Sequence, residues 1–528
     1  MNITKNQILL LCILLTALFL RIWGISFGLP GIDHGDETEV VNHAVRFGSG
    51  DLNPHRFQYG SLMQYILFFL YGAYFGIGYI LGHFSSVHQF ALHFVEDPTI
   101  FYLIARGLSA SLGVCTVVIA YLLGKRIRSD EVGLLASLFV ALNYPHLIHS
   151  HYATVDGALT FFFTCAVYQC LLLCSDGRLV RYLIAGFLIG LAMATKINGV
   201  FALVAFVTAH VLRESDTLFV KKFLSTHFWC GIGAIFLGHF IAGPYFYSNL
   251  NSAFSEMGYL KAMHAFSGFS LWSYVKAFTR DYWGMPLGIL CFAGFIRCLV
   301  TSEKKVRVLS YTTAVVLVFA SLHRYVEAKY ILYSLPLYAV LGSYALMEWC
   351  GSLKKKYLFV IVLIVLAHPV YRAVQWDYDR AQRSITLEAK EWIENHIPRN
   401  TKILLDNVGN AGPKLENAPR NVARQYQRAV EHNLLKAEYL KLKLEISPEI
   451  YYDITWVASS GGFREDDYRR YRLWQDTEEI GHPPEYYRER GFAYIILSDR
   501  YFSVMGDSFT AIKEFRRKRR SIRIYKLQ

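Results

Sequence analysis

Acidic side chains gather in residues 32–39, directly after the first hydrophobic segment of the chain. Asp36 and Glu37 form an adjacent pair of carboxylates there. Charge so close to an apolar segment costs free energy, so charged residues there usually have a function. A positioned carboxylate can take a proton from a hydroxyl group, as a general base does. We therefore interpret Asp36 and Glu37 as catalytic candidates, and Asp33 and Glu39 as solvated loop residues.

Cationic and acidic residues recur in later polar stretches of the chain. Carboxylates can remove a proton, whereas cations can hold a phosphate and stabilise it as it departs. This combination fits transfer of a group from a phosphate-activated donor. No glycine-rich nucleotide loop appears at a strand-to-helix junction, which favours a lipid-linked donor over a nucleotide sugar. The residues are His149, His151, Asp156, Lys196, Arg324 and Lys329.

The composition predicts an α-helical protein that crosses a membrane many times. Of 528 residues, 54% are hydrophobic and 18% are charged, which does not match a soluble domain of this length. The net charge is +13, but the excess Lys and Arg fall in short runs between apolar segments, as the positive-inside rule describes. Nucleic-acid binding is therefore not expected. The nine cysteines accompany hydrophobic segments, so no disulfide framework or CxxC metal site is predicted.

Twelve apolar segments are candidates for transmembrane helices, since a span takes about 20 residues. Eleven are expected to cross, because all basic loops then face the cytoplasm. The exception is 61–82, whose glycines and tyrosines suit an interfacial or re-entrant helix pair. The segments lie near 8–27, 61–82, 100–123, 132–148, 157–174, 182–195, 197–212, 226–246, 284–300, 306–322, 329–348 and 357–373.

Two neighbouring segments, 182–195 and 197–212, are short for full spans. They meet at Thr195 and Lys196, so the turn between them is expected to dip into the membrane. A charged residue held at such a depth needs a partner. We therefore predict a partner of opposite charge for Lys196.

The composition becomes charged and polar after residue 374. Residues 1–374 are predicted to form the transmembrane catalytic domain, and residues 375–528 a small extracytoplasmic α/β domain. The basic run at 516–520 is interpreted as a solvated terminus, or one near anionic headgroups. A helical pattern covers 387–396, and strand-like runs cover 402–405, 454–458 and 494–497.

Short motifs follow one another in a fixed order between about residues 8 and 350. They are Asp36-Glu37, Gly50-Asp51-Leu52-Asn53-Pro54 with Tyr59 and Ser61-Leu62, His149-Ser150-His151-Tyr152-Ala153-Thr154-Val155-Asp156, Ala194-Thr195-Lys196, and Lys329-Tyr330 before Leu335-Pro336. The series resembles the GT-C glycosyltransferases of the protein O-mannosyltransferase and aminoarabinose-transferase type (glycosyltransferase family 39 and relatives). The resemblance implies a GT-C fold of about 11 transmembrane helices with juxtamembrane helices. It also implies inverting transfer of a sugar from a polyprenyl-phosphate donor to a hydroxyl acceptor at the outer membrane face.

The resemblance also implies roles for individual residues. Asp36 takes the place of the catalytic base, Glu37 supports it, and Asp156 is the acidic residue of the second outer loop. We assign the donor phosphate to the outer-face cations Lys196, Arg324 and Lys329, and contacts to the sugar or acceptor to Tyr59, His149 and His151.

A second branch of related enzymes remains an alternative. His34-x-Asp36-Glu37 also resembles the HxDE signature of the dolichol-linked mannosyltransferases of asparagine-glycan assembly. The carrier is accordingly undecaprenyl or dolichyl phosphate, and the acceptor a protein, a lipid or a polysaccharide. We expect a multi-pass protein of the bacterial inner membrane, in contact with membrane lipids, whose active site faces outward.

Other functions were weighed on the same residues. A transporter or flippase usually carries ionisable residues near the bilayer midplane and internal repeats, whereas here the charges cluster at one face and no repeat is found. A sensor or assembly protein would leave Asp36, Glu37 and Lys196 without a purpose. His149 and His151 could bind a divalent metal if their loop is extended, but such residues are as often hydrogen-bonding partners. No metal site is assigned.

Overall fold

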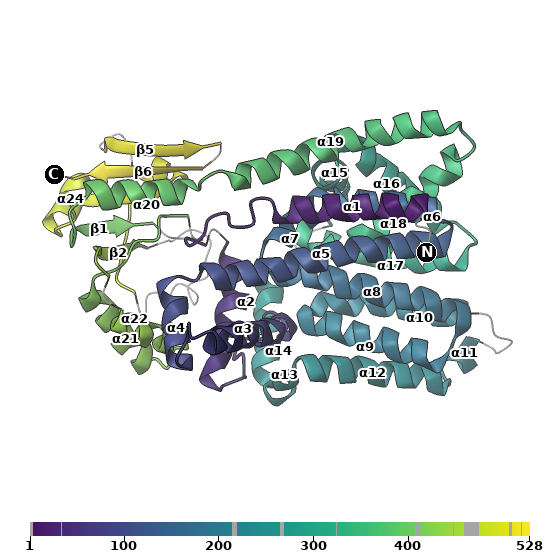
Figure 1. Ribbon diagram of the computed structural model, residues 1–528, viewed down its shortest axis with the longest axis horizontal. Helices are drawn as coiled ribbons and strands as arrows, with labels where there is room; N and C mark the ends of the chain where they lie inside the picture. Colours follow the sequence, from purple (N-terminus) through teal and green to yellow (C-terminus); the bar gives the residue numbers. More distant parts are fainter. Residues whose placement is uncertain are drawn as a thin grey trace. The chain divides into compact units, whose positions relative to one another are not determined.

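The chain folds into two compact units, a helical unit and a sheet unit that also holds helices (Figure 1). The computed structural model describes residues 4–32, 34–213, 219–263, 269–323, 325–406, 411–446, 448–458, 475–505, 509–518 and 520–527. The helical unit comprises residues 1–25, 40–71 and 103–379, and the sheet unit residues 26–39, 72–102 and 380–528. This division differs from a single boundary at 374/375. Helix α19 (Lys355–Ala381) continues past that point, and two N-terminal segments pack with the C-terminal residues.

Apolar helices long enough to cross a membrane make this a multi-pass membrane protein. Judged by length and composition, the described residues contain five such segments, or up to seven if each of two bent helix pairs is one span. The five are α1 (Lys5–Ile22), α3 (Leu62–Ile80), α5 (Thr99–Ile127), α8 (Val155–Asp176) and Lys355–His396, which includes α20 (Ile385–His396). The bent pairs are α6 (Asp130–Ala141) with α7 (Tyr144–His151), at 58°, and α16 (Met285–Leu299) with α17 (Lys304–Ser321), at 117°.

The segment expected not to cross, 61–82, forms one continuous helix rather than a helix pair. This helix is α3, of 19 residues, and the shorter α4 (Val87–Glu96) follows it. Because α3 is long and apolar enough to span, its exclusion from the crossings stays a prediction. The two short segments around Lys196 are as expected: α9 (Leu179–Thr195) ends there, and a 3-10 turn leads into α10 (Ala202–Leu212).

Close helix packing builds the core of the helical unit. Helices α8, α9, α10 and α12 (Thr226–Ala242) lie side by side in Figure 1. A Cβ atom at Gly186 would stand 2.1 Å from the carbonyl oxygen of Gly231, so small residues let α9 and α12 approach each other. The first twelve residues of α18 (Leu335–Cys350) are all buried, which marks a helix surrounded by others.

Shorter helices connect these long ones. Residues 278–282 form a π-helical turn between α15 and α16. The remaining helices are α2 (Gly35–Arg46), α11 (Phe219–Lys222), α13 (Pro244–Ser248), α14 (Leu250–Met263), α15 (Leu271–Ala277), α21 (Pro419–Glu431), α22 (Lys436–Glu445), α24 (Pro484–Glu489) and α25 (Phe502–Met505).

The sheet unit contains one six-stranded sheet of order β3-β2-β1-β4-β6-β5. The three strand-like runs of the sequence form strands, as predicted, and β1 pairs in parallel with β2 and β4, so they lie next to one another in the sheet. Arg516, Arg517 and Arg520 of the basic run do not form a free terminus, because they lie in two antiparallel strands, one of which pairs with β4. The strands are β1 (Lys402–Leu405), β2 (Asp453–Val457), β3 (Thr477–Glu478), β4 (Tyr494–Ser498), β5 (Ala511–Arg517) and β6 (Arg520–Lys526).

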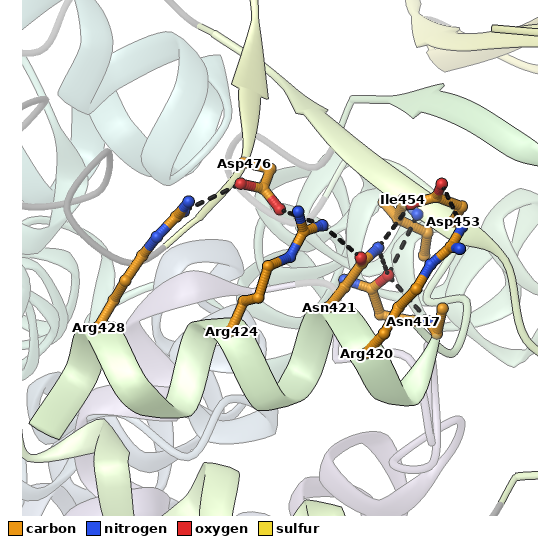
Figure 2. Close-up of polar contacts among 9 residues, drawn as sticks. Asn417, Arg420, Asn421, Arg424, Arg428, Asp453, Ile454 and Asp476 are labelled. Carbon is orange, nitrogen blue, oxygen red and sulfur yellow. Dashed lines mark hydrogen bonds and ion pairs between the residues drawn. The ribbon is translucent and has the colours of Figure 1, made fainter. Parts of the chain in front are cut away.

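Three arginines at four-residue spacing attach α21 to the sheet (Figure 2). Arg420 pairs with Asp453 at 2.8 Å, where β2 begins. Arg424 and Arg428 share Asp476, next to β3, at 3.1 and 2.9 Å. Residues four apart lie on one helix face, so a single face of α21 carries all these contacts. We interpret the row as a structural attachment of the helix.

Candidate active site

A buried ion pair joins two helix ends inside the helical unit. The Nζ atom of Lys196 donates to Oδ1 of Asp156 at 2.8 Å, and the side chains are 13% and 5% exposed. Asp156 stands in the first turn of α8, and Lys196 directly follows α9. Lys196 therefore has the partner that its position in a short apolar turn required. The structure shows that Asp156 supplies it.

The local backbone explains why Lys196 can reach Asp156. The residue is extended, with φ −158° and ψ 138°, because α9 stops at Thr195. A 3-10 turn, Ile197–Phe201, begins immediately afterwards. A lysine ammonium has three donors, and the carboxylate uses one of them. The break thus presents a cation from the end of a membrane helix.

The loop of residues 50–61 closes against this break. The Nζ atom of Lys196 lies 5.7 Å from the centroid of the Tyr59 ring, a cation–π distance. The backbone nitrogen of Gly60 donates to the carbonyl oxygen of Thr195 at 3.2 Å. Upstream, several contacts lower the pKa of Asp51 to about 2, and the hydrogen bond from the backbone nitrogen of Asn53 is the largest of them. The motif around Asp51 therefore orders the loop that brings Tyr59 to Lys196.

Replacing Gly60 by alanine tests this contact. Its Cβ atom would stand 2.0 Å from the carbonyl oxygen of Ala194, so the loop or the helix end must shift by about 1 Å. We expect Gly60→Ala to lower the rate of the reaction assigned below by about tenfold or more, as such a displacement can. The matched control is Gly48→Ala, since a Cβ atom there meets nothing within 4 Å. Equal rates for both variants would contradict the role of this loop.

The two candidate histidines face different partners. His149 and His151 lie in α7, a helix that begins after the N-cap Asn143. Nδ1 of His149 is 3.9 Å from Oδ2 of Asp156, whereas Nε2 of His151 is 3.2 Å from the carbonyl oxygen of Trp23. A metal site on these two histidines would need an extended loop. They lie in a helix instead, on which side chains two positions apart do not face each other. Among the described residues, no group of three or more His, Cys, Asp or Glu could hold a metal ion.

The last predicted cation, Lys329, lies in a 3-10 turn after α17. Its Nζ atom is 2.8 Å from Glu327, and the side chains are 31% and 46% exposed. The same Nζ atom lies 5.7 Å from the centroid of the Tyr330 ring. Arg324 lies outside the described residues.

Asp36 and Glu37 occupy the first turn of α2. Carboxylates are favourable there because the backbone N–H groups of a helix N-terminus carry partial positive charge. Glu37 is fully buried, and Asp36 is partly exposed. Both belong to the sheet unit, whereas Asp156 and Lys196 belong to the helical unit. The catalytic role of Asp36 stays a prediction.

Three charged residues of the helical unit escaped the sequence analysis. Glu256 of α14 accepts a hydrogen bond from the backbone nitrogen of Phe57 at 2.8 Å and so fixes the loop of residues 50–61. Arg21 and Asp377 are fully buried in α1 and α19. A charged residue inside an apolar segment was the signal that could have found Arg21, whereas Asp377 follows the last apolar segment and gave no such signal.

Sequence comparison covers the central part of this site. The family model described as dolichyl-phosphate-mannose-protein mannosyltransferase matches residues 74–244. That range includes Asp156 and Lys196 but neither Asp36 nor Lys329. No curated protein matches the chain.

Comparison with solved structures gives several matches. ArnT from Cupriavidus metallidurans, bound to undecaprenyl phosphate, matches with a TM-score of 0.55 and 12% identity over 98% of this chain and 97% of that one. The Archaeoglobus fulgidus oligosaccharyltransferase in the apo form has a TM-score of 0.49 and 13% identity over 84% of this chain and 69% of that one. The Pmt1–Pmt2 complex of S. cerevisiae has a TM-score of 0.35 and 21% identity over 48% of this chain and 35% of that one. The match with ArnT shows the fold: the chain is a multi-pass membrane protein of the GT-C fold.

Proposed function

We propose that this protein is a glycosyltransferase that moves a sugar, with inversion, from a polyprenyl-phosphate donor to a hydroxyl acceptor at the outer face of the bacterial inner membrane. The observation that carries the proposal is the buried ion pair of Asp156 and Lys196. A lysine held at a helix break in the membrane keeps donors for a second anion beside Asp156. A lipid carrier ends in its phosphate group. This phosphate would meet the ammonium of Lys196 at the same depth in the membrane. ArnT, which shares the fold, was solved with undecaprenyl phosphate.

The reaction requires a base and a stabilised leaving group. In our proposal Asp36 takes the proton of the acceptor hydroxyl, whose oxygen attacks the anomeric carbon of the sugar. The bond from that carbon to the phosphate oxygen breaks, and the polyprenyl phosphate leaves with the bonding electron pair. Lys196 and Lys329 stabilise the negative charge that grows on the phosphate, and Glu37 supports the base. Tyr59 and His149 contact the sugar or the acceptor in this proposal.

A transfer assay with defined lipids tests this function. The purified protein in liposomes is given undecaprenyl- or dolichyl-phosphate sugars that carry a label on the sugar, with serine-containing peptides or lipid hydroxyls as acceptors. Label should appear in an acceptor, or in water by slow hydrolysis, and free carrier phosphate should accumulate. Sealed membrane vesicles of both orientations should react only when the donor reaches the outer face. Consumption of nucleotide sugars in place of lipid-linked ones would overturn the proposal.

The role of Lys329 can be separated from that of a surface ion pair. We expect Lys329→Met to lower kcat by about tenfold at saturating donor, because the charge matters most as the phosphate departs. Lys305→Met, in the first turn of α17 and in a basic stretch expected on the cytoplasmic side, is the control and should match the parent. If both variants keep parental kinetics, the contact of Lys329 with Glu327 is an exposed ion pair worth about 0–1 kcal/mol and nothing more.

A further inference from the structure

A second group of buried ionisable side chains lies in the helical unit. Arg21 of α1, His146 and His151 of α7, and Asp377 of α19 are each at most 1% exposed. Burial of such groups inside a membrane bundle costs free energy, so their presence points to a use. Among the described residues, none of the four forms a hydrogen bond or ion pair with Asp156 or Lys196.

Arg21 anchors the start of α7. Its Nη2 atom lies 2.8 Å from Nδ1 of His146, and its Nη1 atom is 2.9 Å from the carbonyl oxygen of Ala17 and 3.3 Å from that of Ala141. A guanidinium can only donate, so Nδ1 of His146 accepts and the ring proton is on Nε2. A Cβ atom at Gly113 would stand 2.9 Å from Nε of Arg21, so glycine makes room for this side chain.

His151 anchors the end of the same helix. Its Nδ1 atom is 3.1 Å from the carbonyl oxygen of Leu147, and its Nε2 atom is 3.2 Å from that of Trp23. Nε2 also lies 3.6 Å from Oδ1 of Asp377. The ring packs edge-on against Trp376 at 4.6 Å between centroids. The imidazole thus connects α7 to the end of α1 and to α19.

Helix α7 needs such anchors. It has eight residues and is bent by 58° from α6, and helices this short are not stable by themselves. His149, between the two anchored histidines, lies 3.9 Å from Asp156. Three residues separate the end of α7 from the start of α8, and Asp156 lies in the first turn of α8. The position of α7 therefore sets the position of the carboxylate that holds Lys196.

We propose that Arg21, His146, His151 and Asp377 are positioning residues, which fix α7 and through it the ion pair of Asp156 and Lys196. They do not contact the reacting atoms in this proposal. This role rests on the proposed function only in that the pair of Asp156 and Lys196 serves sugar transfer. The position of Lys196 itself can be probed without any sugar.

The test compares two substitutions of His146. His146→Leu removes the acceptor for Arg21, whereas the Oδ1 atom of asparagine in His146→Asn can take the place of Nδ1. We expect His146→Leu to lower kcat by about tenfold or more, with the donor KM changed less than about threefold. His146→Asn should restore kcat to within about threefold of the parent. Mass spectrometry after brief treatment with an amine reagent should show faster labelling of Lys196 in His146→Leu than in the parent, as in the positive control Asp156→Asn.

A matched control is a buried histidine elsewhere in the helical unit. His210 of α10 is 2% exposed and contacts the hydroxyl of Tyr182 at 2.6 Å. His210→Leu should lower thermal stability but leave kcat per folded protein and the labelling of Lys196 at parental values. The inference is overturned if His146→Leu, corrected for its folded fraction, behaves in the same way. If Lys196 labelling rises in His146→Leu although the parent itself transfers no sugar, the positioning role stands and the proposed function fails.

Discussion

Replacing Asp36 by asparagine is expected to lower the rate of sugar transfer by about two to four orders of magnitude, which is the usual contribution of a general base. Asparagine keeps the size and the hydrogen bonding of the side chain but cannot accept the proton. Asp36 lies in the first turn of α2, and the substitution should leave membrane insertion and the helix in place. The measurement is the initial rate of label transfer from a polyprenyl-phosphate sugar at saturating donor and acceptor.

The control for Asp36 comes from the same helix. Glu39→Gln changes a carboxylate one turn further along α2 and should keep the parental rate. Binding of the donor, measured by competition with unlabelled polyprenyl phosphate, should be similar in both variants, because a base acts on the acceptor. A near-parental rate for Asp36→Asn would show that another carboxylate, Glu37 or Asp156, is the base.

Replacing Lys196 by methionine should damage both stability and activity. The substitution leaves the carboxylate of Asp156, which is 5% exposed, without its ammonium partner. Breaking a buried pair in this way typically costs about 3–5 kcal/mol, because one charge is left uncompensated. Transfer should fall by about two to three orders of magnitude, as when a donor that stabilises developing charge is removed. Thermal unfolding in detergent and the transfer rate of the folded fraction measure the two effects.

A double variant separates the two effects of this substitution. Asp156→Asn combined with Lys196→Met removes both charges, so the free energy of unfolding should return to within about 1–2 kcal/mol of the parent. The transfer rate should stay low, because no ammonium remains for the phosphate. Parental stability in Lys196→Met would contradict the buried ion pair. Recovery of transfer in the double variant would show that the pair stabilises the fold without contacting the donor.

The elements of this protein follow from patterns within short stretches of sequence. Apolar segments of sufficient length predict membrane helices, and the short, mostly apolar runs at 402–405, 454–458 and 494–497 predict strands. The structure has β1, β2 and β4 at these places. The hairpin of β5 and β6 was missed, because its exposed basic residues hide the pattern of a strand that is buried on one side. Local patterns of this kind can be recognised without knowing which elements pack against each other.

The sequence alone also required a partner for Lys196, since a lysine at a break between two short membrane helices is too costly without one. It could not name Asp156, 40 positions earlier, because that choice depends on how α8 and α9 pack. Likewise, His149 and His151 resemble a pair of ligands in an extended loop, whereas α7 directs them to Asp156 and to Trp23. The contacts that join Arg21 to α7 and α7 to Asp377 connect residues more than 100 positions apart. Such contacts arise from the packing of whole helices, which no periodicity within one segment encodes.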